Sequence, residues 1–286
     1  MDIDYNTYCY HFETVNYDKG FLDKCVDATY VIHLEDNGRY EHIKEQMTIF
    51  QPTKNVYIAH NAGFTKCKKR LIDQISYQDL SDAFLQCFKH ANDHGYNNVL
   101  ILEDDFIFNS DIKKSENIDS IADFLKEKEK EEDTGFIYYL GCNPIIVYPC
   151  SLNLNHYKSI KSMSMHSIIY SRKARNIKNM KVDLKHWDVI VENSITNRYL
   201  YYKPLCYQTY PDTDNKKSWS EKDGNIIISY IKLGIIQALN LDKEYEPGFS
   251  IIYGFSKFLF CSFILFIFAT FYYLCKKIVK MVIVVH

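Results

Sequence analysis

The sequence predicts an α/β fold, in which a mostly parallel sheet is flanked by helices and is followed by a C-terminal transmembrane helix. Three observations predict this architecture. Short apolar runs that are typical of buried strands alternate with segments of helical period from residue 28 onward. Alternation at this spacing favours strands that are connected through helices and run largely parallel. Near the C-terminus, an apolar stretch without charged residues is long enough to cross a bilayer.

The strands are predicted from short apolar runs bounded by polar or turn-forming residues. The run at 99–102 is apolar throughout, which is typical of a central strand with both faces buried. The predicted strands are 29–34, 55–59, 99–102, 136–140, 167–170 and 199–206.

The helices are predicted from apolar residues that recur on one face. Gly95 follows the clearest apolar stripe, as expected after a helix C-terminus. That stripe comprises Leu80, Ala83, Phe84, Cys87, Phe88 and Ala91. A second helix begins at Ile118 and continues into the charged run 126–133, which is most simply a solvated helix end or loop. Further helical segments are predicted at 38–49, 171–180 and 184–196.

Length and composition indicate one globular domain with extensions. The chain has 286 residues, of which 47% are hydrophobic, so it has room for a sizeable core. A formal net charge of -2 argues against a dedicated nucleic-acid binder, which normally carries a basic excess. The predicted segments are an N-terminal extension (1–27), a main α/β domain (28–219), a stem (220–257), a transmembrane helix (258–275) and a basic tail (276–286).

The predicted membrane anchor is the segment 258–275, which contains no charged residue and is flanked by Lys257 and Lys276. At about 1.5 Å per residue it spans about 27 Å, close to the thickness of a hydrocarbon core. A buried core helix is the alternative, but apolarity on all sides favours an anchor. The basic tail favours a cytoplasmic C-terminus, with the domain outside.

Two other features favour a cytoplasmic domain, which is the orientation that we predict. The N-terminus has no basic start followed by an apolar core, as a cleavable signal peptide would have. The nine cysteines are odd in number and form no C-x-x-C pair, which argues against a disulfide framework or a zinc site and for a reducing compartment. A host membrane or a virion is a possible location.

Three adjacent acids, Glu103, Asp104 and Asp105, follow the predicted central strand 99–102. Ligands of open α/β sheets bind beyond the carboxyl ends of the strands, where these acids are expected. Buried together, they require neutralisation, and a hard cation such as Mn²⁺ or Mg²⁺ takes carboxylate ligands. Side chains alternate along a strand, so Glu103 and Asp105 face one cation only if the strand has already turned. The alternative is a solvated turn or helix cap.

The order of the motifs resembles glycosyltransferase family 25, the lipopolysaccharide and collagen galactosyltransferase group, over roughly residues 28–210. The stretch 30–47 is similar to that family's first strand and arginine-bearing helix, and 99–108 (VLILEDDFIF) to its acidic motif. GFIYYLGC (135–142), MHSIIYSRKA (165–174) and KHWD (185–188) follow in the same order. Viral and giant-virus sequences carry a similar combination.

The resemblance implies a GT-A-like, Rossmann-like fold and the transfer of a sugar from a nucleotide-sugar donor, a UDP-sugar for example, with inversion. Mn²⁺ or Mg²⁺ is the implied cofactor, with Glu103, Asp104 and Asp105 as its ligands. Asp188 is the implied catalytic base or an acceptor-binding group; its alternative is a first-turn acid of a helix. The segment 79–84 departs from the family pattern at a place that normally lines the donor site, which puts the identity of the sugar in doubt.

Further candidates surround this predicted centre. Arg39 and the basic cluster Lys66, Lys68 and Lys69 are candidates for binding the donor diphosphate, although basic clusters are usually solvated. His33, at the tip of the first strand, is a candidate for contacting the nucleotide base. Possible metal or acceptor contacts are His186, His166, Trp187 and Gln208, of which the histidines are more often structural and the tryptophan more often part of the core.

These observations predict a membrane-anchored, metal-dependent glycosyltransferase that acts on a glycan, lipid-linked or protein acceptor. Another metal-dependent nucleotide-processing enzyme is an alternative, but no Gly-rich phosphate loop follows the first strand. A catalytically inactive, glycosyltransferase-like viral membrane protein is the second alternative, supported by the altered segment 79–84.

Overall fold

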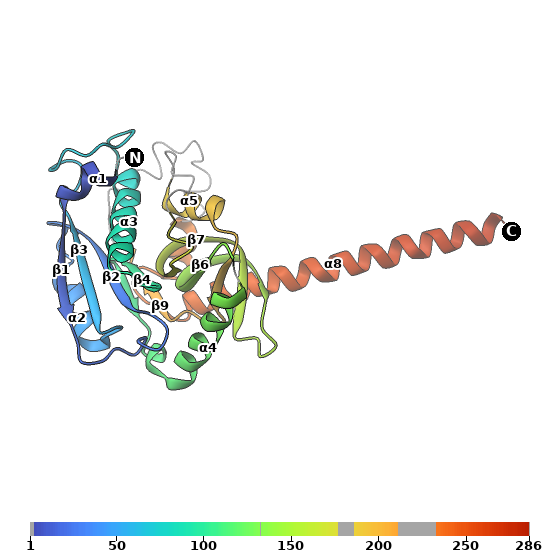
Figure 1. The fold of residues 1–286 in the computed structure, drawn as a ribbon. Coiled ribbons are helices and arrows are strands. Elements are labelled where there is room, and N and C mark those ends of the chain that lie inside the picture. Colours follow the sequence, from blue (N-terminus) through green and yellow to red (C-terminus); the bar gives the residue numbers. More distant parts are fainter. Residues whose placement is uncertain (1–2, 132, 177–185, 211–232, 286) are drawn as a thin grey trace.

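A computed structural model describes residues 3–131, 133–176, 186–210 and 233–285, and shows a mixed sheet with helices on both faces (Figure 1). The sheet has seven strands in the order β1-β3-β2-β4-β7-β6-β8. These strands are β1 (Tyr10–Asn16), β2 (Ala28–Leu34), β3 (Asn55–Asn61), β4 (Asn98–Glu103), β6 (Ile137–Pro149), β7 (His156–Ser171) and β8 (Arg198–Tyr201).

The sheet is more mixed than predicted. Strands β2, β3 and β4 are parallel neighbours, and β6 and β8 form a second parallel pair. Between these two groups lies β7, which is antiparallel to both β4 and β6. Because β7 returns directly from β6 through a hairpin, it must run in the opposite direction. The two parallel groups therefore point the same way, and the carboxyl ends of β2, β4 and β6 lie at one edge.

The helices cover the two faces of the sheet in pairs, as the apolar stripes predict. Phe84 and Phe88 of α3 and Trp187 of α5 pack in one core cluster, while α2 and α4 contribute Ile43, Met47, Ile118 and Ile121 to the other. The helices predicted at 38–49, at 80–91 and from Ile118 are confirmed, and α5 forms the centre of the predicted segment 184–196. The bounds are α2 (Tyr40–Phe50), α3 (Ser76–Asp93), α4 (Ser115–Glu131) and α5 (Trp187–Ser194).

The second half of the domain differs from the prediction in three places. Strands β6 and β7 extend well beyond 136–140 and 167–170 and form a long hairpin. The predicted strand 199–206 is divided at Pro204, and its second part is β9 (Cys206–Gln208), which pairs with β5 (Phe106–Phe108) in a separate two-stranded sheet. Residues 172–175 form turns where a helix was predicted, and the remainder of that segment, 177–180, lies outside the described residues.

The N-terminal residues are part of the domain, which corrects the prediction of an extension over 1–27. Strand β1 pairs antiparallel with β3 along its whole length. The short helices α1 (Ile3–Asn6) and η1 (Thr7–Cys9) precede it. A disulfide joins Cys9 to Cys67, with 5.8 Å between the Cα atoms. The expectation that the cysteines form no disulfide is therefore wrong for this pair.

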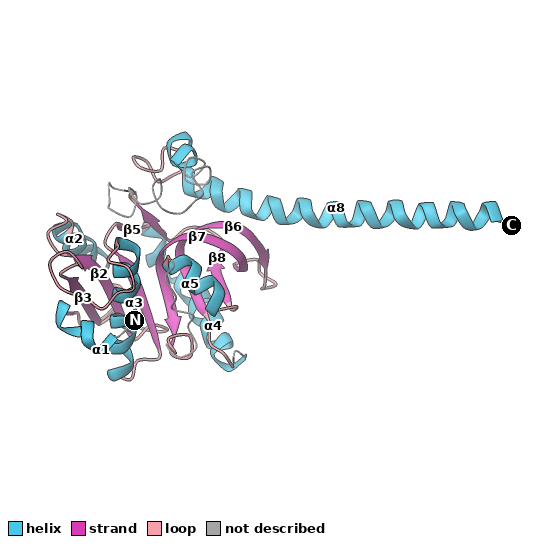
Figure 2. Cartoon of the chain, turned by 90° about the horizontal axis from the view of Figure 1, so that it is seen from above, coloured by secondary structure: helices cyan, strands magenta, loops and turns pink. Residues whose placement is uncertain are grey.

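The C-terminal helix α8 (Gly248–Val285) projects from the domain as one continuous helix (Figure 2). Its segment Gly248–Lys276 is long and apolar enough to cross a membrane. Phe249 and Tyr253, in its first turns, are buried against the domain, whereas no residue from 258 to 276 is buried. Of the predicted stem, residues 220–232 lie outside the described part, and Ile236 and Leu241 are packed in an apolar cluster with Tyr207 of the domain.

Candidate functional site

Glu103 is the last residue of β4, and the two acids that follow it, Asp104 and Asp105, have different environments. Arg39 forms an ion pair with Asp104, Asn37 donates a hydrogen bond to the same carboxylate, and the backbone N–H of Leu34 lies 3.4 Å from it. Asp104 is thus neutralised by groups from the loop after β2. The pairing engages Nη1 of Arg39, and binding of the donor diphosphate by this side chain stays a prediction.

Asp105 is the acid that lacks such a partner. Its Oδ2 accepts a hydrogen bond of 3.0 Å from Nε2 of Gln208, which lies in β9. Its Oδ1 is buried and makes no hydrogen bond to any described residue. Burial raises the pKa of Asp105 to about 7; the charge of Asp104 adds to this effect, and Arg39 opposes it. Asp105 therefore titrates near neutrality.

Further unpartnered oxygen atoms belong to Gln208, which bonds Asp105, and to Asn143, which bonds Tyr210. Gln208 Oε1 and Asn143 Oδ1 are also buried without a hydrogen bond to any described residue. Asn143 lies in β6 and donates to the hydroxyl of Tyr210, which follows β9. All three unpartnered atoms are acceptors, and buried acceptors are normally satisfied, by an ion or water where protein is absent. This edge of the sheet is therefore suited to a ligand that brings positive charge or hydrogen-bond donors.

Asp188 is brought to the same region from the first turn of α5. Its carboxylate accepts a hydrogen bond of 2.9 Å from the backbone N–H of Ser164, in β7. Burial raises the pKa of Tyr210, and the charges of Asp105 and Asp188 both contribute to this shift. The Tyr210 hydroxyl thus lies in the fields of both carboxylates, which the sequence places more than eighty residues apart. We name Asp105, Asn143, Asp188, Gln208 and Tyr210 the polar centre.

The polar centre does not form a complete metal site by itself. Within the described residues, no group of three or more His, Cys, Asp or Glu side chains is arranged to hold a metal ion. The predicted ligand set of Glu103, Asp104 and Asp105 is therefore not assembled. A cation such as Mg²⁺ commonly takes only one or two carboxylates and completes its shell with substrate phosphates and water. The unpartnered Oδ1 of Asp105 fits that mode of binding.

Of the residues predicted to bind the donor, Arg39 and His33 lie beside Asp104, whereas Lys66 and Lys68 are exposed. His33, at the end of β2, is buried, and its Nδ1 is 3.1 Å from Nδ1 of His60. His60 in turn contacts Glu13 of β1. Lys66 is exposed and pairs with Asp36, and Lys68 is exposed. Binding of the donor by these two exposed lysines stays a prediction.

The candidates His166, Trp187 and His186 have packing roles. Both ring nitrogens of the buried His166 face backbone carbonyls, of Ser164 at 2.8 Å and Cys206 at 3.1 Å. Burial lowers the pKa of His166 to about 4, and the two carbonyl groups oppose this shift. Trp187 is buried and stacked on Phe84 at 4.4 Å, so it is part of the core and does not offer a face to a sugar. His186 lies 4.4 Å from the ring of Tyr77 at the start of α5.

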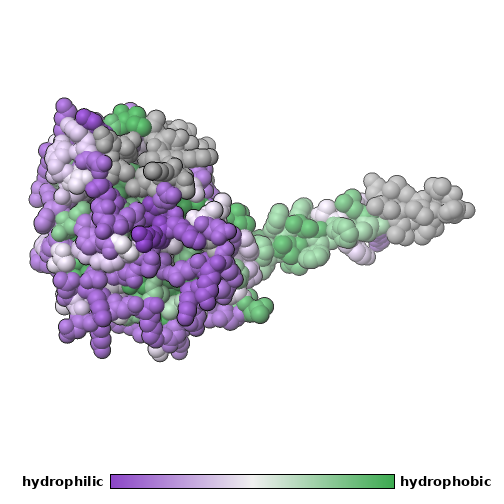
Figure 3. Space-filling view, viewed as in Figure 1, coloured by the Kyte–Doolittle hydropathy of each residue, from purple (hydrophilic) through white to green (hydrophobic). Residues whose placement is uncertain are grey.

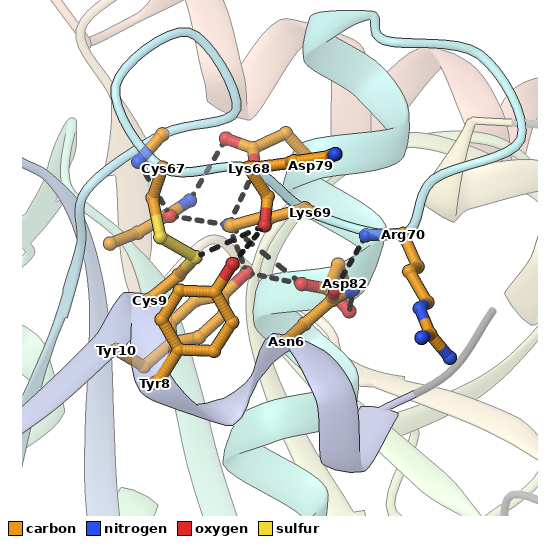
Figure 4. Close-up of a disulfide and its surroundings, with 12 residues drawn as sticks. Asn6, Tyr8, Cys9, Tyr10, Cys67, Lys68, Lys69, Arg70, Asp79 and Asp82 are labelled. Carbon is orange, nitrogen blue, oxygen red and sulfur yellow. Dashed lines mark hydrogen bonds and ion pairs between the residues drawn. A yellow bond between two sulfur atoms is a disulfide. The ribbon is translucent and has the colours of Figure 1, made fainter.

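A second charged cluster escaped prediction (Figure 4). The side chain of Lys69 is fully buried and donates three hydrogen bonds of 2.6 Å, to Tyr10, Asn61 and Asp79. Asp82 lies 3.7 Å from the same ammonium group and accepts from Asn6 and Tyr10. The segment 79–84 therefore supplies both acids of an internal ion network. In sequence, Lys69 looked like one more residue of a surface lysine cluster.

A comparison with protein-family models and with curated protein sequences found no match to this chain. Assignment of a function therefore depends on the geometry of the polar centre and on the order of the sequence motifs.

Proposed function

We propose that the domain is a glycosyltransferase that moves a sugar from a nucleotide-sugar donor to an acceptor hydroxyl. The observation that carries this proposal is the polar centre, where two carboxylates from separate elements flank unpartnered acceptors at the carboxyl edge of an α/β sheet. Ligands of such sheets bind at this edge. The arrangement also supports the GT-A-like fold that the motif order implies.

The roles follow from the surroundings of each acid. Asp105, with Gln208 beside it, would hold Mn²⁺ or Mg²⁺ together with the donor diphosphate. The cation supplies charge that stabilises the diphosphate leaving group. Asp188 is assigned the role of base: the acceptor oxygen attacks the anomeric carbon, the bond from that carbon to the diphosphate breaks, and the acceptor proton passes to the Asp188 carboxylate. Arg39 keeps Asp104 neutralised beside this centre.

The acceptor is assigned to the membrane surface. Phe249, in the first turn of α8, lies 6.3 Å from Tyr210 and 5.2 Å from Tyr207 between ring centroids. Phe258 lies nine positions after Phe249, and no residue from 258 to 276 is buried. At about 1.5 Å per residue this corresponds to about 14 Å along the helix. The polar centre therefore lies close to the base of the anchor, which favours a lipid-linked or membrane-protein acceptor.

Binding of nucleotide-sugars tests the proposed activity. The full-length protein in detergent is titrated with UDP-, GDP- and CMP-sugars, with and without Mn²⁺, beside Asp188→Asn and the exposed control Asp18→Asn. We expect Mn²⁺-dependent binding of one donor by all three proteins, and transfer to a lipid-linked acceptor about 100-fold slower in Asp188→Asn only. A protein that binds no donor under any condition contradicts the proposal.

A non-catalytic membrane protein is the second candidate, and a specific observation favours it. Asp79 and Asp82 occupy the segment that normally lines the donor site of family 25, and both are engaged with Lys69 inside the domain. Because the carboxylates of this segment pair with Lys69, fewer of its side chains can contact a donor. The same titration separates the two candidates, because the scaffold binds neither Mn²⁺ nor a nucleotide-sugar.

We infer that the domain lies on the oxidising side of the membrane, with the basic tail in the cytoplasm. The Cys9–Cys67 disulfide supports this orientation, because disulfides persist in oxidising compartments. It also removes the cysteine argument for a cytoplasmic domain. Lys276, Lys277 and Lys280 after the apolar segment support the same orientation through the positive-inside rule.

Thiol counting in cells tests this orientation. The protein is expressed in a eukaryotic cell, denatured in the presence of a maleimide–polyethylene glycol and analysed by its gel shift. We expect the seven free cysteines to react before reduction and all nine after it. In sealed microsomes, protease is expected to remove only the tail. Nine reactive thiols without reduction, together with a digested domain, would place the domain in the cytoplasm.

A further inference from the structure

The β6–β7 hairpin carries exposed leucines at its turn. This turn, residues 150–155, contains Leu152, which is fully exposed, and Leu154, which is 55% exposed. Single exposed apolar residues are ordinary on protein surfaces, but two leucines together at the tip of a hairpin are an apolar projection. What these leucines contact can be inferred from the elements that lie beside the turn.

The hairpin lies against α8 where the helix leaves the domain. The rings of Tyr148 and Phe260 are 5.9 Å apart between centroids. Nζ of Lys257 lies 4.9 Å from the ring centroid of Tyr157 and also contacts the ring of Tyr202. Figures 1 and 2 show β6 and β7 on the side of the domain from which α8 projects. In the space-filling view, apolar surface continues along the emerging helix (Figure 3).

The first turns of α8 pack against the domain, and they therefore determine how far this side of the domain lies from a bilayer. Ser256 is buried, Lys257 contacts the domain, and no residue from 258 to 276 is buried. The helix is continuous through this point. A bilayer that covers the apolar segment therefore begins at the level of Tyr148 and Tyr157. Tyrosine and lysine are the residues that typically lie at the boundary between water and lipid.

We propose that the turn of the β6–β7 hairpin, through Leu152 and Leu154, inserts into the lipid surface that α8 enters. The partner is the bilayer itself, because the turn adjoins the helix at the level where the apolar segment begins. Two separate contacts, the helix and the turn, then hold the domain in one orientation on the membrane. The proposal does not depend on the reaction that the domain catalyses.

Tryptophan depth measurements test the insertion. Full-length Leu152→Trp is reconstituted at low protein density into phosphatidylcholine vesicles with or without bromine on the acyl chains. The spectrum of the parent, which contains two tryptophans, is subtracted. The control is Ile49→Trp, since Ile49 is 50% exposed on α2, which lies on the side of the domain remote from α8 (Figure 1).

We expect the emission of the Leu152→Trp residue to shift to shorter wavelength and to be quenched at least about twofold by brominated lipid, with no quenching of the control. Emission from both variants that is unaffected by brominated lipid overturns the proposal. A shift to shorter wavelength without quenching, growing with protein density, also overturns it, because it shows that the turn is covered by a second copy of the chain.

Discussion

Replacing Asp105 with asparagine is expected to abolish Mn²⁺-dependent binding of a nucleotide-sugar while it makes the unliganded protein more stable at pH 8. The side chain is buried, its Oδ1 has no hydrogen-bond partner among the described residues, and burial raises its pKa to about 7. Asparagine keeps the shape and an oxygen for the hydrogen bond from Gln208, but it carries no charge. We expect transfer to fall by about 100-fold or more.

The stability effect has a definite sign. In the unfolded chain Asp105 loses its proton near its ordinary value of 3.8, whereas the folded protein retains it to about pH 7. Between these values the folded state binds more protons, so the free energy of unfolding falls as the pH rises. Asparagine does not titrate, so it does not contribute this fall in the free energy of unfolding. We expect the Tm of Asp105→Asn to exceed that of the parent by at least about 2 °C at pH 8, and the difference to shrink by pH 5.

Asp111 provides a control of opposite sign. Hydrogen bonds from Lys114 and Lys203 lower the pKa of this carboxyl group, which is partly exposed. Asp111→Asn is therefore expected to lower the Tm slightly at pH 8 and to leave donor binding unchanged. Thermal unfolding at the two pH values and titration with Mn²⁺ measure both effects. A parent that is more stable than Asp105→Asn at pH 8 contradicts the assignment of Asp105 as a strained functional acid.

Periodic burial explains which elements are predictable from the sequence. Strand β4 and helix α3 are buried along a whole element or a whole face, so their apolar residues recur at the period of the backbone. Strand β1 is an edge strand with the sequence YHFETVN, none of whose residues is fully buried. It was missed because it is held by pairing with β3 rather than by an apolar pattern.

The candidate site was predictable in its location but not in its pairings. Asp105 and Asp188 could be expected near the same end of the sheet. Asp105 follows a buried strand, and Asp188 lies in KHWD (185–188), whose place in the chain matches the motif order of the resembled family. Whether Arg39 contacts a carboxylate or a phosphate depends on the position of the loop after β2, and both partners suit a guanidinium group equally. Gln208 lies next to Asp105 because β9 pairs with β5, and this pairing connects segments about one hundred residues apart in the sequence.

Replacing Lys69 with methionine is expected to lower the free energy of unfolding by about 3–5 kcal/mol, because it leaves buried carboxylates without their counter-ion. The ammonium group is fully buried, lies 2.6 Å from Asp79 and 3.7 Å from Asp82, and has three acceptors for its three protons. Burial lowers the pKa of Lys69, and the two aspartates oppose that shift. Methionine has a similar length but donates nothing, so two acids remain in a site from which water is excluded.

The neighbouring residue Lys68 is the matched control for this variant. Its side chain is exposed, and Lys68→Met is expected to change the free energy of unfolding by no more than about 0.5 kcal/mol. Adding Asp79→Asn and Asp82→Asn to Lys69→Met removes the uncompensated charges and is expected to restore most of the loss. Denaturant unfolding of the three variants measures these differences. If Lys69→Met were as stable as Lys68→Met, the lysine would have to be solvated, and the docking of the N-terminal strand onto α3 would need another explanation.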